Sequence, residues 1–302
     1  MQGTPQSGFL DLPGELQDPR RAMVHILPIP YEATVSYGRG TREGPAAIIA
    51  ASHEVELYDA ELDAEPSLVW GVHTLPALRA DWRTPEAMMA GIADAAEEVA
   101  RAGKFLLALG GEHSISAGVV RGIRRLIPEP LTIVQIDAHA DLRDDYHGTR
   151  YSHACAMRRI LDENPGPLIQ IGIRSCSAEE AAYIKENRGR IMLWSPDLIR
   201  AEDPIDFHHQ LKSSLAGRKI YLTIDVDGMD PSVVPATGTP EPDGLGWHQT
   251  CDIIHAVASA GEVVAMDCVE LAPRPGLHAS DFSVAKLLYK SLSSIMAAQG
   301  RP

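Results

Sequence analysis

The sequence predicts an α/β fold with three layers, in which helices cover both faces of a mainly parallel sheet. Short apolar runs rich in Val, Ile and Leu alternate along the chain with segments of helical spacing. Most of these runs lack polar alternation, which is typical of strands buried on both faces, and strands alternating with helices favour parallel crossover units. We expect strands at 24–30, 104–110, 131–136, 168–174, 190–194, 219–224 and 263–269.

Six segments carry signals of helices, and 84–102 is the clearest of them. Thr84 can cap this helix, Pro85 suits its first turn and Gly103 can end it. Its apolar side chains recur at helical spacing and predict one buried stripe, formed by Met88, Ile92, Ala95 and Val99. We also expect helices at 45–51, 114–126, 178–187, 247–260 and 281–297.

Length and charge limit the classes of protein to which the chain can belong. It has 302 residues, with 27 Lys and Arg against 41 Asp and Glu, for a net charge of -14. We expect an N-terminal arm at 1–20 and one α/β domain at 21–302. The acidic balance argues against nucleic acid as a partner, because phosphate backbones are bound by basic surfaces. We expect a cytoplasmic protein with no membrane partner, since no apolar run reaches roughly 18 residues and the N-terminus lacks a basic, apolar leader.

The segment after the expected strand 131–136 combines two carboxylates with an imidazole. Asp137, His139 and Asp141 lie two residues apart, so in an extended chain their side chains project to the same side. Such a group cannot share a dry site unless something offsets the charge, and a divalent cation does so. We therefore interpret this segment as part of a metal site rather than as a solvated turn.

Two further strand ends add candidate metal ligands. Asp225 and Asp227 follow the expected strand 219–224, and His113 follows 104–110 after two glycines that allow a tight turn. Four Asp and two His without a sulfur ligand suit two divalent ions, with Mn²⁺ favoured and Fe²⁺, Co²⁺, Ni²⁺ or Zn²⁺ as alternatives. Two metal ions about 3.5–4 Å apart activate a bridging water. The residues alone therefore predict a binuclear metallohydrolase.

Seven segments stand in a fixed order along the chain: GTREGP at 40–45, GGEHS at 110–114, DAHAD at 137–141, HGT at 147–149, DVDGMDP at 225–231, ATGTPEP at 236–242 and DCVE at 267–270. In this order they resemble the ureohydrolase family of arginases and agmatinases, and bacterial agmatinases most of all. The resemblance runs from about residue 31 to residue 288 and implies an arginase-like fold, two Mn²⁺ ions per subunit and a homo-oligomer, a trimer or hexamer.

The resemblance also implies how the metal ligands are divided between the two ions. Two of the carboxylates bridge the ions in this arrangement. One ion is held by His113, Asp137, Asp141 and Asp225, and the other by His139, Asp137, Asp225 and Asp227.

The chemistry that the resemblance implies is hydrolysis of a guanidino group by a hydroxide that bridges the two metal ions. Glu270 holds the substrate guanidinium by a charge-assisted contact, and Thr239 helps to stabilise the intermediate before it collapses to urea and an amine. The leaving amine needs a proton, which a histidine can carry. The resemblance favours His147 for this role and leaves His153 as a rival or a second pocket residue. The catalytic residues are thus expected to be His147, Glu270 and Asp141.

The loops outside the metal centre indicate which substrate the enzyme cleaves. The loop 142–146 is short and lacks the Asn- and Ser-rich character of arginases. The segments 147–154 and 239–242 are more like those of agmatinases, which implies that agmatine is cleaved to putrescine and urea, a step of polyamine biosynthesis. Asp144 and Asp145 can attract the amine at the far end of agmatine.

Several alternatives stay open at this point. Arg143 or Arg150 can meet a carboxylate, so 4-guanidinobutyrate, another guanidino acid or arginine is a possible substrate, and formiminoglutamate is a further one. Two alternatives belong to other classes of function. A binuclear metallophosphoesterase would need phosphate-binding cations near the metals, and no Lys lies near any of the three groups of candidate metal ligands. A non-catalytic metal-binding regulator would be expected to lack a ligand or the proton carrier, yet every candidate position is filled.

Overall fold

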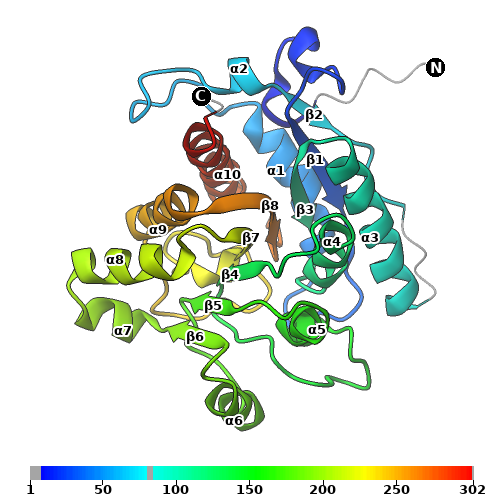
Figure 1. Ribbon diagram of the computed structural model, residues 1–302. Helices are drawn as coiled ribbons and strands as arrows, with labels where there is room; N and C mark the ends of the chain where they lie inside the picture. The colour runs from blue at the N-terminus through cyan, green and yellow to red at the C-terminus, as the bar shows by residue number, and fades with distance from the viewer. Residues whose placement is uncertain (1–7, 80–83, 301–302) are drawn as a thin grey trace.

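Eight strands form one parallel sheet through the middle of the molecule (Figure 1). The computed structural model describes residues 8–79 and 84–300. Within them the strand order is β2-β1-β3-β8-β7-β4-β5-β6, and the expected three-layer α/β fold with a mainly parallel sheet is confirmed. The strands are β1 (Val24–Ile29), β2 (Val72–Thr74), β3 (Phe105–Gly110), β4 (Thr132–Ile136), β5 (Leu168–Ile171), β6 (Ile191–Trp194), β7 (Lys219–Asp225) and β8 (Glu262–Val269).

Seven of these strands lie where the apolar runs predicted them. All residues of β1, β3, β4 and β5 are buried, which explains why their sequences show no alternation of apolar and polar side chains. Strand β2 was not predicted. It has three residues at the edge of the sheet and only its first is buried, so its sequence holds too little of a pattern to find.

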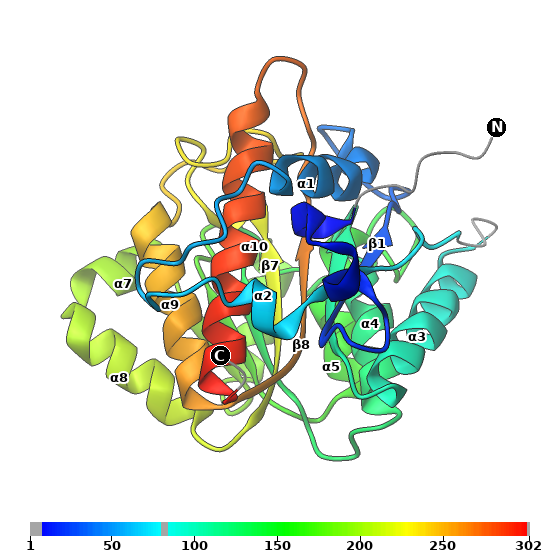
Figure 2. The same ribbon diagram turned by 90° about the horizontal axis from the view of Figure 1, so that it is seen from above.

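Helices cover both faces of the sheet, and Figure 2 shows the two layers on opposite sides of β7 and β8. One layer contains α3 (Pro85–Arg101), α4 (Ile115–Arg124) and α5 (Ala156–Glu163), and α6 (Ala178–Glu186) packs against the same apolar cluster. The other layer contains α1 (Gly44–Ser52), α8 (Pro204–Leu215), α9 (Trp247–Ala260) and α10 (His278–Ala298). The short helices α2 (Ser67–Trp70) and α7 (Pro196–Ala201) complete the described set. No described helix is long and apolar enough to cross a membrane.

Helix α3 follows the sequence signals closely. The Thr84 hydroxyl accepts a hydrogen bond from the Ala87 amide, and Gly103 takes the left-handed conformation just after the helix, at φ +71°. Of the expected apolar stripe, Met88, Ile92 and Val99 are buried and Ala95 is half-buried.

Helices α5, α7 and α8 were not predicted as separate elements. Helix α8 buries Phe207, Leu211 and Leu215 at helical spacing, and the Asp203 side chain caps its first turn. Two adjacent histidines, of which His208 is half-buried and His209 exposed, lie between Phe207 and Leu211 and make this apolar stripe hard to detect in the sequence. The other expected helices are present with ends that shift by a few residues at most.

The described part of the expected N-terminal arm packs against the rest of the domain. Phe9 is fully buried, and Leu12 and Leu16 are buried near it. The Phe9 amide donates to the Thr74 hydroxyl, and the Leu10 amide donates to the Ser52 hydroxyl, so the chain is attached to β2 and α1. Residues 1–7 of the expected arm lie outside the described residues.

The middle of the sheet positions the candidate site. Strands β3, β8, β7 and β4 are neighbours, and because they are parallel their carboxyl ends meet at one edge. Ligands of open α/β sheets bind beyond such ends, at points where the order of the strands along the chain changes. In this sheet, strands that are neighbours in space but not in sequence meet between β3 and β8 and between β7 and β4. The four segments that leave these strands therefore surround one space.

Candidate metal centre

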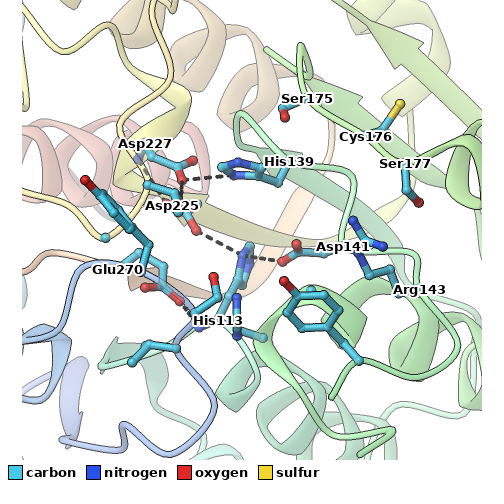
Figure 3. A pocket seen from close by; sticks show the side chains of 18 of the residues that line it. His113, His139, Asp141, Arg143, Ser175, Cys176, Ser177, Asp225, Asp227 and Glu270 are labelled. Carbon is cyan, nitrogen blue, oxygen red and sulfur yellow. Dashed lines mark hydrogen bonds and ion pairs between the residues drawn. The ribbon is translucent and has the colours of Figure 1, made fainter. Parts of the chain in front are cut away.

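The edge formed by β3, β7 and β4 brings all six expected metal ligands together. His113 follows β3, and Asp225 ends β7 with Asp227 in the tight 3-10 turn after it. The β4 end supplies Asp137, His139 and Asp141. Figure 3 shows the labelled members of this group converging on one space, with Asp225 and Asp141 reaching His113 from opposite sides. The four Asp residues are each at most 5% exposed, so water does little to screen the repulsion between their charges.

The first half of the centre is arranged around the ring of His113. Its Nδ1 atom lies 3.0, 3.1 and 3.2 Å from carboxylate oxygens of Asp137, Asp141 and Asp225, respectively. This buried nitrogen nevertheless has no hydrogen bond of acceptable geometry within the described residues. A nitrogen surrounded by three carboxylate oxygens without a hydrogen-bond partner fits a metal ligand, because a cation can satisfy all four donor atoms at once.

The second half of the centre is arranged around His139. Its Nδ1 atom lies 3.0 Å from Asp227 Oδ2 and 3.7 Å from Asp137 Oδ1. One ligand atom from each of His139, Asp137 and Asp227 falls within 4.8 Å of the others, and the same holds for His113, Asp137 and Asp141. Because Asp137 belongs to both groups, the donor set fits two adjacent ions with a shared carboxylate.

The electrostatics of the cluster also fit a pair of cations. Burial and then the charges of Asp227 and Asp137 raise the pKa of Asp225 well above its usual range. Burial and then Asp137 raise the pKa of Asp141 to about 7. Burial lowers the pKa of His139, but the nearby carboxylates of Asp137 and Asp227 outweigh it and raise that pKa to about 12. The carboxylates thus destabilise one another and stabilise any positive charge placed among them.

Hydrogen bonds from neighbouring residues fix the ligands, and sequence reasoning did not identify these partners. Thr223 Oγ1 lies 2.9 Å from His113 Nε2 and donates to Asp267 Oδ1 over 2.6 Å. Gln135 Nε2 donates to Asp137 Oδ2 over 2.7 Å. Such contacts orient metal ligands and tune them. The signal was present, because Asp267 and Gln135 are polar residues inside otherwise apolar strands, but only the sheet register places them beside the ligands.

The backbone at the centre is tight and in places strained. A Cβ on Gly228 would lie 2.7 Å from the Asp137 amide nitrogen, so only glycine lets the turn after β7 approach the end of β4. Asp141 and Glu270 adopt left-handed backbone conformations, with φ of 52° and 66°. Non-glycine residues keep such conformations where the surrounding structure holds them, often at functional sites. Here the Glu270 amide donates to the Gly111 carbonyl over 2.8 Å.

A cavity of about 250 Å³ opens over the cluster. Glu270 lies in it, 7% exposed, and its Oε1 atom accepts a hydrogen bond from the His113 amide. Burial and then the charge of Glu112 raise the pKa of Glu270. Figure 3 shows Glu270 on one side of the space and Arg143, Ser175, Cys176 and Ser177 on the other. The described lining also includes His153 and Thr239, together with Tyr37, Tyr146 and Glu180. Sequence reasoning did not identify Cys176, which is exposed and lines the cavity.

The structure separates the remaining expected residues into two groups. Thr239 lines the cavity, with its hydroxyl 3.3 Å from Asp227 Oδ2, and His153 lines it as well. Among the described lining residues, neither His147 nor the pair Asp144 and Asp145 occurs.

Asp144, Asp145 and His147 lie outside the cavity because other residues of the protein bind or pack against them. Asp144 Oδ1 accepts from Arg159 at 2.7 Å and from Arg150 at 2.9 Å, so its charge is balanced within the protein. Asp145 Oδ1 accepts from the Gly148 amide in a turn. The His147 ring packs against Tyr146, with ring centres 4.1 Å apart. The expectation that Asp144 and Asp145 meet the substrate therefore has no support in this arrangement.

Comparisons with known proteins agree with this geometry. A family model described as the arginase family matches residues 22–293. An N(1)-aminopropylagmatine ureohydrolase from Synechocystis sp. is 41% identical over 273 residues, which cover 89% of this chain and 88% of that protein. An agmatinase from Bacillus anthracis is 34% identical over 254 residues, which cover 83% of each chain.

Solved structures show the same likeness over nearly the whole chain. The agmatine ureohydrolase of Thermoplasma volcanium is 28% identical and similar with a TM-score of 0.86, covering 98% of this chain and 97% of its own. The expected resemblance to ureohydrolases is confirmed. The chain therefore belongs to the arginase family and is a ureohydrolase, a hydrolase of guanidino compounds.

Proposed function

We propose that this ureohydrolase cleaves a guanidino compound with an amine-bearing tail, either agmatine or its aminopropyl derivative, and releases urea. The observation that carries the proposal is the placement of buried Glu270 in the cavity that five of the six expected ligands line. Relatives named for aminopropylagmatine and for agmatine support a tail that ends in an amine. With agmatine the amine product is putrescine.

We further propose that two Mn²⁺ ions per subunit occupy the cluster. The donors are four carboxylates and two imidazoles without sulfur, which suits Mn²⁺. His113, Asp137, Asp141 and Asp225 would hold one ion, and His139, Asp137, Asp225 and Asp227 the other. Such a pair of ions, when bound, supplies Lewis acidity and lowers the pKa of a water molecule between them.

Glu270 binds and orients the substrate in this proposal. A guanidinium is planar and presents parallel N–H donors, so a carboxylate can accept two of them. Burial strengthens that contact, because water does not compete for the charge. The His113 amide holds Oε1 of Glu270 at 2.7 Å, which fixes the carboxylate next to the metal ligands. The guanidinium carbon is thereby placed beside the cluster.

His153 carries the proton in this proposal, in place of His147. Hydrolysis of a guanidinium by water gives urea and an alkylammonium ion, so both hydrogen atoms of the water end on the leaving amine. A side chain in the cavity must therefore accept a proton and deliver it to that nitrogen. Burial, the largest cause, lowers the pKa of His153 below its usual range, so its ring is neutral and one of its nitrogens can accept a proton. His153 lines the cavity, whereas His147 does not.

The outer part of the cavity disfavours a carboxylate tail. Arg143 is the residue there that could bind one, but its guanidinium already has partners. Its Nε atom lies 3.8 Å from the Glu180 carboxylate, and its charge lies over the Tyr146 ring at 4.9 Å. Because Glu180 balances Arg143, the cavity keeps the negative character of the metal cluster and of Glu270, which attracts a cationic tail.

A urea-release assay with a panel of guanidino compounds tests the proposal. With Mn²⁺-loaded protein we expect aminopropylagmatine or agmatine to give a kcat/KM at least about tenfold above those of 4-guanidinobutyrate and arginine, equivalent to about 1.4 kcal/mol. Urea release from none of these compounds would contradict the catalytic proposal. A preference for 4-guanidinobutyrate would instead assign Arg143 to a substrate carboxylate.

Replacing Asp144 by Asn is expected to leave kcat/KM for the preferred amine substrate within about twofold of the original. The Asp144 carboxylate is bound by Arg159 and Arg150 outside the cavity, so its charge is largely neutralised before any substrate arrives. Steady-state kinetics at low and moderate salt provide the measurement. A tenfold rise in KM at both salt concentrations would instead place Asp144 in substrate binding.

A further inference from the structure

A hydroxyl on the loop after β1 reaches the ring of His153. Thr34 Oγ1 lies 3.2 Å from His153 Nδ1 and accepts a hydrogen bond from the His153 amide over 2.9 Å. The same oxygen lies 2.7 Å from Oε1 of Glu112, the residue before the metal ligand His113. Hydrogen bonds thus connect Glu112 to Thr34 and Thr34 to His153. Thr34 and His153 are 119 positions apart in the sequence.

The directions of these hydrogen bonds follow from the surroundings of Glu112. Its Oε2 atom accepts from the amides of Ala33 and Thr34, both over 2.6 Å. Its Oε1 atom accepts from the Ser114 hydroxyl over 2.7 Å as well as from Thr34. Glu112 is fully buried, and its side chain serves as an acceptor for every one of these donors. The single hydrogen of the Thr34 hydroxyl therefore points to Glu112.

A hydroxyl that has given its hydrogen to Glu112 can only accept from the imidazole. The Nδ1 atom of His153 must then carry a hydrogen and donate it to Thr34. In a neutral imidazole this leaves the lone pair on Nε2, which lies on the opposite edge of the ring. The Tyr146 ring packs edge-on beside His153, with ring centres 5.9 Å apart and an angle of 88° between the ring planes.

We propose that Thr34, held by Glu112, is a positioning residue that fixes His153 with its hydrogen on Nδ1 and with Nε2 available to accept and return the proton. The inference rests on the proposed function, in which His153 carries the proton to the leaving amine. The other contact of Nδ1, with the Ser152 hydroxyl at 3.3 Å, is longer than the one with Thr34. Without the Thr34 hydroxyl, the ring can adopt the other tautomer, which has no acceptor at Nε2.

The test compares two substitutions of nearly the same shape in the Mn²⁺-loaded enzyme. Thr34→Val removes the hydroxyl and keeps the branched side chain, and we expect kcat to fall about tenfold or more while KM and the Mn²⁺ content change less than twofold. Thr34→Ser restores the hydroxyl and should restore most of the lost kcat. A loss of kcat that is equal in both variants would overturn the proposal, because it would follow from packing and not from the hydrogen bond.

A double-mutant cycle with His153→Asn separates this inference from the proposed function. His153→Asn alone should lower kcat by about 10²–10⁴-fold, and Thr34→Val should add less than twofold to that loss, because it acts through a ring that is no longer present. If His153→Asn keeps full activity, the proposed role of His153 fails. If His153→Asn is impaired and Thr34→Val multiplies the loss by its full factor, His153 keeps its role and the inference about Thr34 fails.

Discussion

Replacing Asp225 by Asn is expected to abolish urea release and to reduce the content of bound Mn²⁺ to one ion or none per subunit. Asp225 is 3% exposed and its Oδ2 atom lies 3.2 Å from His113 Nδ1, within the first half of the centre. An amide keeps the shape of the side chain but removes the negative charge that two cations require. Loss of an outer partner of a metal ligand already costs about 10–100-fold in metal affinity, so loss of a ligand should cost more. Metal analysis after dialysis, together with the urea assay, provides the measurement.

Asp230 offers a matched control for this substitution within the same acidic segment. Its Oδ1 atom accepts from the Ser232 amide and its Oδ2 atom accepts from the Gly244 amide, so it organises a turn away from the cluster. Asp230→Asn should therefore keep two Mn²⁺ ions and most of the activity. Equal metal loss in both variants would indicate general disruption of the segment. Full metal content and activity in Asp225→Asn would contradict the proposed centre.

Replacing Glu270 by Gln is expected to lower kcat/KM by about 30- to 4,000-fold without loss of metal. The range corresponds to the roughly 2–5 kcal/mol that follows when one partner of a buried, hydrogen-bonded charge pair is removed. Gln can still accept the hydrogen bond that the His113 amide donates, so the local backbone should persist. The neutral amide of Gln cannot balance the charge of the guanidinium, however. Its NH₂ group is also a donor and would face the N–H donors of the guanidinium.

The measurement for Glu270 combines steady-state kinetics with metal analysis and thermal unfolding. Unchanged Mn²⁺ content and melting temperature with a large loss of kcat/KM would support a direct contact with substrate. A kcat/KM within threefold of the original enzyme would remove Glu270 from substrate binding. A parallel loss of metal would instead assign it to holding the His113 segment.

Much of the fold was predictable because its strands are buried on both faces. Strands such as β3 and β4 are short runs of apolar residues whose burial needs no knowledge of the partner strand. The edge strand β2 and the short helix α7 were not predictable in this way, since each buries only one or two residues against the elements beside it. The strand order was likewise decided by packing, because no local signal specifies that β8 lies between β3 and β7.

The sequence by itself determined the composition of the candidate metal cluster. Asp137, His139 and Asp141 share a side of the chain through period-two spacing, and the other ligands follow buried strands, so their convergence needs only the rule that parallel strands end at one edge. Only the tertiary structure decided which residues of 142–155 face the cavity. Asp144 turns to Arg159, and His153 is held by Thr34 from a distant loop. The physical reason is that loop side chains take their directions from hydrogen bonds and ion pairs with residues far apart in sequence, which no local spacing encodes.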